Sequence, residues 1–257
     1  MTILHAVILS FIEGVTEFLP ISSTGHMILA STLLRITETD FVKSFEIIIQ
    51  LGAILAVLVL YWKKLLLNKA VFARVCVAFI PTAFVGFVLY KFIKTVLLGN
   101  PWIVVWSLGL GGVFLILLEI IHKEKTYHIE EIKNITFLQV FFIGISQSIS
   151  IIPGVSRSAA TIVGALIMGV KRETAVEFSF LLAIPTMAAA TGLDLAKSAK
   201  HFTGSQYELL GIGFFVAFVT AFIVVPWFIG FVKNHTFIPF GVYRICLALA
   251  FVFFVLR

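Results

Sequence analysis

Fourteen residues near the N-terminus concentrate side chains that could do chemistry. The stretch Glu13-Gly-Val-Thr-Glu17-Phe-Leu-Pro-Ile-Ser-Ser-Thr-Gly-His26 puts two carboxylates, several hydroxyls and an imidazole into an otherwise apolar sequence. Glu13 and Glu17 are four residues apart, so a helix places both carboxylates on one face, about one turn apart. Pro20 ends that helix and can open another, whose free N–H groups and positive dipole end attract anions. Two acids beside a hydroxyl-rich helix start suggest metal-assisted phosphate chemistry.

The acidic pair has several roles open to it. Glu13 and Glu17 offer the carboxylate oxygens that Mg²⁺ and Ca²⁺ prefer, and such ions often bridge to substrate phosphates. Glu17 could instead be a general base. In a purely structural role, the pair would be hydrogen-bonded to hydroxyls or to Arg244. An unpaired buried acid is costly in a membrane, which favours a direct role in metal binding or catalysis.

The hydroxyls and the imidazole form a second candidate group. Ser22, Ser23 or Thr24 alone would be an ordinary helix N-cap. His26 lies three and four residues after Ser23 and Ser22, so it can share a helix face with either. A hydroxyl beside a histidine can become a nucleophile or protonate a leaving group. A structural histidine is the alternative.

A second polar cluster follows the midpoint, at Pro153-Gly-Val-Ser-Arg-Ser-Ala-Ala-Thr161. A helix that starts here offers free N–H groups, the hydroxyls of Ser156 and Ser158, and the Arg157 guanidinium. Arginine binds phosphate through a planar fork that lysine lacks. We therefore predict phosphate binding at Arg157; a structural ion pair with Glu177 is the alternative.

Four further polar groups interrupt apolar segments. Glu46 and Gln50 share a helix face at a spacing of four, and Gln147 and Glu177 are their loose counterparts in the second half. We expect these side chains to support the residues that touch substrate, with Gln50 a candidate at the metal. Hydrogen bonds that only pack helices together are the alternative.

Composition defines the class of protein. Hydrophobic residues make up 60% of the 257 and charged residues only 12%, against about 25% charged in soluble domains. The net charge of +6 comes without a basic tract interleaved with aromatics, so nucleic acid is not an expected partner. Cys76 and Cys246 lie in apolar runs and form no CxxC motif. The chain is predicted to be an all-α polytopic membrane protein.

Six apolar segments approach the ~20 residues that span a bilayer. Two further pairs of short helices, over residues 2–34 and 137–168, are too short to cross and are predicted to be re-entrant hairpins. Broken backbone at membrane depth requires a polar cavity or burial in protein. The predicted spans are Phe45–Trp62, Val71–Tyr90, Pro101–Ile121, Thr174–Leu193, Leu209–Phe231 and Phe237–Leu256.

The pattern of one hairpin and three spans occurs twice. Gly14-Val-Thr-Glu17 matches Gly144-Ile-Ser-Gln147, with three extra residues before the second proline motif. We predict one membrane domain of two repeats, residues 1–121 and 136–257, separated by the polar linker 122–135. Three crossings per repeat invert one repeat relative to the other, and such pairs place polar sites at their interface near mid-membrane.

Orientation follows from the loop cations. Slightly more Lys and Arg fall on the side of Lys63, Lys64 and Lys171 than on the side of Arg35 and Lys43. This bias predicts that both termini and the mouth of the first hairpin face the outside.

At these motifs the sequence resembles the undecaprenyl-pyrophosphate phosphatase family, the bacitracin-resistance membrane phosphatases of bacteria. The resemblance covers essentially the whole chain and includes Phe45-Glu-Ile-Ile-Ile-Gln50-Leu-Gly and Glu177-Phe-Ser-Phe-Leu-Leu-Ala-Ile-Pro185. It implies hydrolysis of undecaprenyl pyrophosphate to the monophosphate and orthophosphate, which recycles the lipid carrier of cell-wall synthesis. It also implies a divalent metal, interdigitated inverted repeats and an active site open to the outer face of the plasma membrane.

Matching positions then imply roles for individual residues. Glu13 and Glu17 are the acidic motif, Ser23 the nucleophile unless water attacks directly, His26 its acid/base partner, and Arg157 the phosphate clamp. The expected partners are a polyprenyl pyrophosphate lipid and the membrane, with homodimerisation left open. The remaining residues expected to contact substrate are Ser22, Thr24, Gly154, Ser156, Ser158 and Thr161.

A transporter or flippase is the alternative function. Inverted repeats with broken helices are typical of secondary transporters, so the protein could move a polyprenyl phosphate lipid or another anion without cutting it. Release of orthophosphate by purified protein would distinguish the two.

Overall fold

The computed structural model describes residues 1–89, 97, 100–121, 128–198 and 202–256. Over these residues the chain is helical and has no β-strand, as the sequence predicts. The predicted end of a span at Tyr90 and residues 122–127 of the predicted linker lie outside the described residues. The helices are α1 (Ile3–Thr16), α2 (Ser23–Leu33), α3 (Asp40–Trp62, continued by a π-helical turn Lys63–Leu67), α4 (Lys69–Val88), α6 (Pro101–Ile121), α7 (Phe137–Ser148, continued by a 3₁₀ turn Ile149–Ile151), α8 (Arg157–Ile167), α9 (Arg172–Ser198), α10 (Gly204–Val232) and α11 (Ile238–Val255), with a further 3₁₀ turn at Ile132–Asn134.

Six of these helices are long and apolar enough to cross a membrane, among the residues described. They are α3, α4, α6, α9, α10 and α11, and each coincides with most of one predicted span; α11 is one residue shorter than predicted at each end. Helix α3 begins earlier than predicted, at Asp40, because the Thr39 side chain caps it by accepting a hydrogen bond from the N–H of Val42. Large apolar side chains such as Phe84, Phe87 and Trp106 are exposed on the outside. A lipid environment accounts for that exposure.

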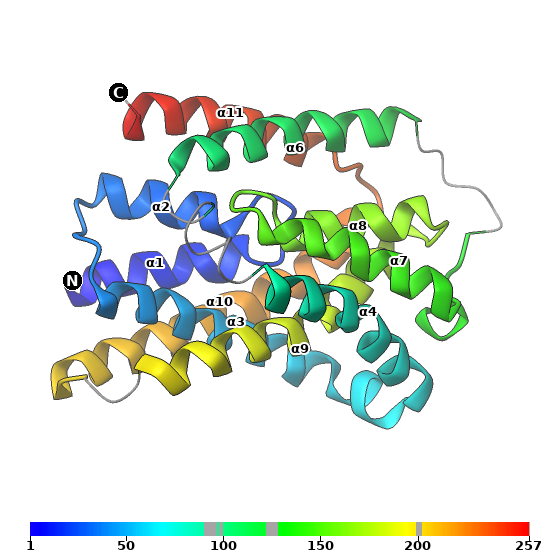
Figure 1. Ribbon diagram of the computed structural model, residues 1–257, viewed down its shortest axis with the longest axis horizontal. Helices are drawn as coiled ribbons and strands as arrows, with labels where there is room; N and C mark the ends of the chain where they lie inside the picture. The colour runs from blue at the N-terminus through cyan, green and yellow to red at the C-terminus, as the bar shows by residue number, and fades with distance from the viewer. Residues whose placement is uncertain (90–96, 98–99, 122–127, 199–201, 257) are drawn as a thin grey trace.

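The four shorter helices form two pairs that approach each other end to end. In Figure 1 the α1–α2 pair extends from one end of the molecule and the α7–α8 pair from the other, and the bends between the paired helices meet near the middle. Helices α6 and α11 run side by side on one face, and α3, α9 and α10 lie on the opposite side. The two bends, residues 17–22 and 152–156, are called the first and second bend below.

The two halves of the chain exchange packing partners. Helix α1 packs on α10 from the second half, and α7 packs on α4 from the first half. Glycines permit both contacts: a Cβ at Gly14 would lie 2.8 Å from the carbonyl oxygen of Ala217, and one at Gly144 would overlap that of Ala78. Such close approach of backbones is how helices commonly associate in membranes. Re-entry into a bilayer and inverted symmetry stay predictions.

Replacing Gly144 with alanine is expected to destabilise the α4–α7 contact. The new methyl group must push the Ala78 backbone away, and overpacking of this kind costs about 1–3 kcal/mol. We expect a lower thermal midpoint of unfolding in detergent. Gly86→Ala on α4 is the matched control, because a Cβ there meets nothing within 4 Å; equal midpoints for the two variants would contradict the packing described.

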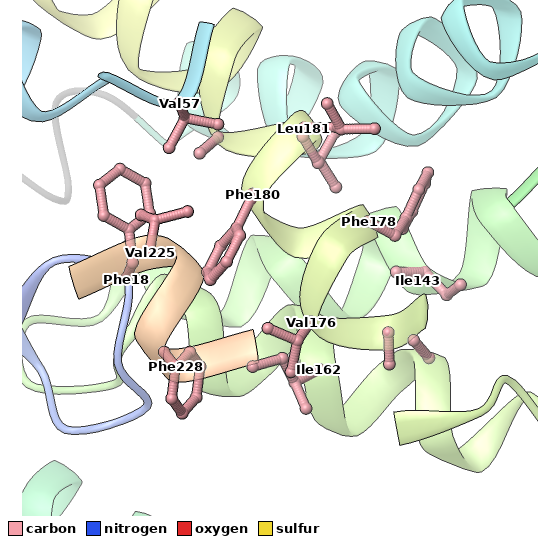
Figure 2. Packing of buried hydrophobic residues seen from close by; sticks show 14 of the residues in the cluster. Phe18, Val57, Ile143, Ile162, Val176, Phe178, Phe180, Leu181, Val225 and Phe228 are labelled. Atoms are coloured by element: carbon pink, nitrogen blue, oxygen red, sulfur yellow. The ribbon is translucent and has the colours of Figure 1, made fainter. Parts of the chain in front are cut away.

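A cluster of buried aromatic side chains holds the first bend in place. Figure 2 shows Phe18, which follows Glu17, in one buried cluster with Phe180 of α9 and Phe228 of α10. The rings of Phe18 and Phe180 meet edge to face with centroids 5.4 Å apart, and those of Phe180 and Phe228 are 6.1 Å apart. Edge-to-face aromatic pairs add about 0.5–1.5 kcal/mol beyond burial. The residue next to the acidic motif is thereby fixed to the core.

Candidate active site

A cavity lies where the two bends meet. The first bend and the start of α2 contribute Glu17 and three hydroxyl residues, and the second bend contributes backbone, hydroxyl and guanidinium groups. Gln50 of α3 and Met187 of α9 complete its wall. The prediction that the acid-and-serine motif faces the arginine motif is therefore confirmed. The lining residues are Glu17, Ser22, Ser23, Thr24, Gln50, Ser150, Ile152, Pro153, Gly154, Val155, Ser156, Arg157 and Met187.

The first bend directs a serine toward an acid. Ser22 has the unusual backbone angle φ of 70° and caps α2, its side chain accepting a hydrogen bond from the N–H of Gly25 at 3.4 Å. A non-glycine residue with positive φ is uncommon and concentrates at functional sites. Ser23 is the first residue of α2, and its hydroxyl donates a short hydrogen bond to a carboxylate oxygen of Glu17.

The second bend directs an arginine toward the same acid. Gly154 has φ of 90°, and a Cβ there would lie 2.8 Å from the carbonyl oxygen of Val104, so glycine is required on two grounds. Ser156 caps α8 by accepting from the N–H of Ala159 at 3.2 Å. Arg157 is therefore the first residue of α8, where the positive end of the helix dipole and the guanidinium act together.

Direct contacts join the two bends. Arg157 donates to the other carboxylate oxygen of Glu17 at 3.0 Å and to the carbonyl of Ser179 at 3.0 Å. Its Nη2 also contacts the sulfur of Met187 at 3.4 Å, and its guanidinium lies over the Phe18 ring, 5.6 Å from the centroid. The ion pair is nearly enclosed, with side-chain exposures of 10% for Arg157 and 7% for Glu17. The structural alternative, an Arg157–Glu177 pair, is wrong.

The guanidinium of Arg244 on α11 forms hydrogen bonds to both bends. Its guanidinium donates to the carbonyl of Pro20 in the first bend at 3.3 Å and to that of Gly154 in the second at 3.0 Å. It also donates to the carbonyls of Ser107 and Leu108 on α6, at 2.9 and 3.4 Å. Only 1% of Arg244 is exposed. The alternative in which Arg244 pairs with the acids is wrong; it bonds carbonyl oxygens of the chain that forms the cavity.

Glu13 is a buried acid with unsatisfied oxygens. Within the described residues, neither of its carboxylate oxygens has a hydrogen-bond partner, and the residue is 1% exposed. The charged groups that act on it are Glu17, Glu46 and Arg157. Leaving a buried carboxylate unpaired is expensive, so these oxygens would be satisfied by a bound cation or by a proton shared with Glu17. The donor set of Glu13 and Glu17 therefore fits Mg²⁺ or Ca²⁺, although no cluster of three or more His, Cys, Asp or Glu side chains occurs in the described part of the chain.

His26 does not pair with a serine hydroxyl as the sequence predicted. The Ser23 hydroxyl turns to Glu17 instead, because the bend at Ser22 directs it back toward the end of α1. The Nδ1 of His26 lies 2.8 Å from the carbonyl oxygen of Ser22, and its Nε2 lies 2.7 Å from the hydroxyl of Tyr243 on α11. His26 lies beside the cavity and is not among its lining residues.

The four expected supporting residues lie in different surroundings. Gln50 lines the cavity. Glu46 accepts from the Ser31 hydroxyl at 3.4 Å and acts on Glu13 only through its charge. Gln147 donates to two threonine hydroxyls between α4, α7 and α9. Glu177 forms an ion pair with Lys64 at 2.6 Å, away from the cavity. The prediction that Glu177 supports the site is therefore wrong.

The expected substrate contacts divide in the same way. Ser22, Thr24, Gly154 and Ser156 line the cavity. Ser158 donates to the carbonyl of Leu19 at 2.8 Å, so it joins the bends without lining the cavity. Thr161 donates to the carbonyl of Arg157 at 2.9 Å and to Gln147 at 3.3 Å. The prediction that Ser158 and Thr161 contact substrate is therefore wrong, because each hydroxyl donates to a buried acceptor within the protein.

Several residues of this region were not predicted from the sequence, including Ser150, Ile152 and Val155 on the cavity wall. Met187 contacts Arg157 and lines the cavity, and Tyr243 bonds His26. An apolar methionine in a spanning helix has no signal that separates it from core residues. Tyr243 adjoins Arg244, a charged residue inside a span, and that neighbour was the only available hint.

Comparisons with known proteins show the family of this chain. The family model described as bacitracin resistance protein BacA matches residues 6–250. The chain belongs to the BacA family. Similar members include proteins named undecaprenyl-diphosphatase from Sulfurihydrogenibium sp. (strain YO3AOP1), 53% identical over 251 residues and 98% of both chains, and from Aquifex aeolicus (strain VF5), 51% identical over the whole of both chains. A third, from Wolinella succinogenes, is 49% identical over 99% of this chain and 98% of its own. In this BacA-family chain the family match includes both bends, five of the long helices in full, and α11 as far as residue 250.

Proposed function

We propose that the protein hydrolyses undecaprenyl pyrophosphate to undecaprenyl phosphate and orthophosphate. The observation that carries the proposal is the single cavity in which Glu17 contacts both Ser23 and Arg157. A nucleophile candidate, an acceptor for its proton and a phosphate-binding cation thus lie together. The relatives named undecaprenyl-diphosphatase, which match over nearly full length, support the choice of substrate.

Binding of the pyrophosphate would use the groups that the bends present. Arg157 begins α8 and Ser23 begins α2, so both helix N-termini are directed at the cavity with their free N–H groups. In phosphoryl transfer, catalysis comes mainly from positioning and from charge stabilisation on the transferred group. Arg157 would exchange its contact with Glu17 for the terminal phosphate and so become the phosphate clamp.

Attack would start at the serine. The Ser23 hydroxyl donates to Glu17, which is the arrangement of a nucleophile with its base. Ser23 Oγ would bond to the terminal phosphorus as its proton passes to Glu17, the bridging P–O bond would break, and undecaprenyl phosphate would leave. Glu17 would pass that proton to the leaving undecaprenyl phosphate, and its free carboxylate would deprotonate a water that attacks the phosphorus. As orthophosphate leaves, the proton taken from the water would pass from Glu17 to Ser23 Oγ.

Serine substitutions are expected to differ in severity. Ser23→Ala should reduce kcat by about 10²–10³-fold, since it removes the attacking atom and leaves only binding and charge stabilisation. Ser22→Ala removes a helix cap worth about 0.5–2 kcal/mol and should cost less than tenfold. Initial rates of orthophosphate release would measure both. If both variants remain nearly as active as the unaltered protein, water attacks directly and neither serine is the nucleophile.

A divalent cation, Mg²⁺ or Ca²⁺, is proposed at Glu13 and Glu17. When bound, it would neutralise charge on the pyrophosphate oxygens. Glu13 supplies two unpartnered oxygens, and Gln50 on the cavity wall offers an amide oxygen as a further donor. Glu17 would then have to divide its oxygens between the cation and its present partners.

Chelation is expected to stop the reaction. EDTA should lower orthophosphate release by about 10²-fold or more, because a catalytic metal contributes several kcal/mol, and added Mg²⁺ or Ca²⁺ should restore it. Glu13→Gln should weaken binding of Mg²⁺ alone as measured by calorimetry, whereas Glu38→Gln, which alters an exposed acid paired with Lys43, should not. Activity that is unchanged by EDTA would mean that Glu13 and Glu17 serve as bases only.

The membrane arrangement is proposed on less direct grounds. We infer a bacterial plasma-membrane protein built of inverted repeats, with re-entrant hairpins and with the cavity open to the outer face. The exchange of packing partners, α1 with α10 and α7 with α4, is what interdigitated repeats would give. Cysteine accessibility at Thr24, an exposed residue of the cavity wall, would test the orientation. Measurement of the mass of the protein in detergent would show whether it forms a homodimer.

Orthophosphate release by the purified protein tests the central proposal. In detergent, with undecaprenyl pyrophosphate as substrate, we expect catalytic turnover and formation of undecaprenyl phosphate. A transporter or flippase would bind the lipid and release no orthophosphate. That result would replace hydrolysis with transport.

A further inference from the structure

His26 is held from both sides by groups that come from distant parts of the chain. Its Nδ1 lies 2.8 Å from the carbonyl oxygen of Ser22, and its Nε2 lies 2.7 Å from the hydroxyl of Tyr243. The imidazole and phenol rings are nearly parallel, at 6°, with centroids 5.4 Å apart. His26 is 9% exposed and Tyr243 is 45% exposed. The imidazole is thus fixed in position, and the phenol lies at the outer edge of α11.

These contacts determine which ring nitrogen holds the proton. A carbonyl oxygen only accepts hydrogen bonds, so Nδ1 must donate to Ser22. In the neutral imidazole Nε2 is then the acceptor, and the Tyr243 hydroxyl is its donor. The Ser22 carbonyl thereby fixes the Nδ1-protonated tautomer, and the Tyr243 hydroxyl, which can donate or accept, takes the donor role toward Nε2.

The bond to Ser22 stabilises the backbone where it is strained. Ser22 has φ of 70°, and Ser23 follows it directly. Holding the Ser22 carbonyl fixes the peptide group from which Ser23 projects toward Glu17. A continuous series of hydrogen bonds therefore runs from Tyr243 through His26 to the serine turn.

We propose that His26 and Tyr243 are positioning residues: Tyr243 occupies Nε2 and holds the imidazole in place, so that His26, in its Nδ1-protonated form, holds the serine turn and transfers no proton itself. The inference rests on the proposed phosphatase function and adds two roles to it. An acid or base at His26 would need a ring nitrogen directed at the cavity, and both nitrogens are bonded elsewhere. Glu17 already accepts from Ser23.

The tautomer can be measured without any activity. In protein labelled with ¹⁵N-histidine, the His26 signals, assigned by their loss in His26→Asn, should show the Nδ1-protonated neutral form. Tyr243→Phe keeps the stacked ring and removes only the donor, so the Nε2 signal should shift toward that of an unbonded imine nitrogen while Nδ1 stays protonated. An Nε2-protonated His26 in the unaltered protein, or an Nε2 signal that is unchanged in Tyr243→Phe, would overturn the proposal.

Substitutions at His26 separate positioning from proton transfer. An asparagine amide can donate to the Ser22 carbonyl from nearly the position of Nδ1 but cannot act as acid or base near neutral pH. His26→Asn should retain activity within about tenfold of the unaltered protein, and His26→Leu should lose at least ten times more. Equal loss in the two variants would assign His26 to proton transfer and contradict the proposal.

Loss of the tyrosine donor should act on kcat. Tyr243→Phe is expected to lower kcat about three- to tenfold, the effect of one hydrogen bond, with KM changed less than twofold because phosphate binding is untouched. Tyr61→Phe on α3, away from the cavity, is the matched control and should match the unaltered protein. If the unaltered protein releases no orthophosphate, the proposed function fails, and the ¹⁵N measurement still decides whether His26 is Nδ1-protonated and bonded by Tyr243.

Discussion

Arg157→Ala is expected to reduce orthophosphate release by about 10³-fold or more. A cationic group that stabilises the transferred phosphoryl contributes about 10³–10⁵ in comparable reactions. Here the loss is compounded, because Arg157 also holds Glu17 at 3.0 Å and stands at the N-terminus of α8. Arg157→Lys should recover little, since an ammonium group lacks the planar fork that binds two phosphate oxygens. Steady-state kinetics on undecaprenyl pyrophosphate would measure both variants.

The control must separate loss of the clamp from loss of the fold. Arg157 also bonds the carbonyl of Ser179, so both variants need a thermal midpoint in detergent alongside their rates. Arg35→Ala removes an exposed arginine outside the cavity and should leave the rate unchanged. A folded Arg157→Ala that retained more than a tenth of the activity would remove Arg157 from the site.

Glu17→Gln is expected to have an effect of similar size, about 10²–10⁴-fold on kcat, the contribution of a positioned general base. The amide keeps the size of the side chain but cannot accept the proton of Ser23. It also loses the charge that Arg157 faces, and it is a poorer metal ligand than a carboxylate. The rate of orthophosphate release at saturating Mg²⁺ would isolate the loss of the base.

Glu177, an acid outside the cavity, is the matched control for Glu17. Glu177 belongs to a long family motif, yet its carboxylate pairs with Lys64 and not with the bends. Glu177→Gln should therefore stay within about threefold of the unaltered rate, because a partly exposed ion pair contributes little. Should Glu177→Gln prove as inactive as Glu17→Gln, Glu177 would belong to the active site.

The long helices and both bends could be predicted because their signals are local. Apolar length identifies a span, and a proline with polar neighbours identifies a break. The segment after Pro20 and the segment after Pro153 each begin a short helix, at Ser23 and Arg157. The repeated pattern of hairpin and spans was enough to predict that the two polar motifs would meet, but not that Glu17 would be the partner of Arg157.

Partners within the site could not be predicted because they depend on backbone direction and on distant contacts. Spacing alone allowed Ser23 to face His26, but the positive φ at Ser22 turns the hydroxyl to Glu17. Tyr243 contacts His26 across 217 positions of sequence. Glu177 resembled a site residue in the sequence, yet the lysine that neutralises it lies on another helix. Periodicity contains no information about such pairs.

The most direct test is an experimental structure with Mg²⁺ and a methylene-bridged analogue of the polyprenyl pyrophosphate, which cannot be cleaved at the bridge. The account predicts that the terminal phosphonate lies in the cavity, within hydrogen-bonding distance of both the Ser23 hydroxyl and the Arg157 guanidinium, with the cation on Glu13 and Glu17. A headgroup bound outside the cavity, or held by one bend while the other faces away, would contradict it.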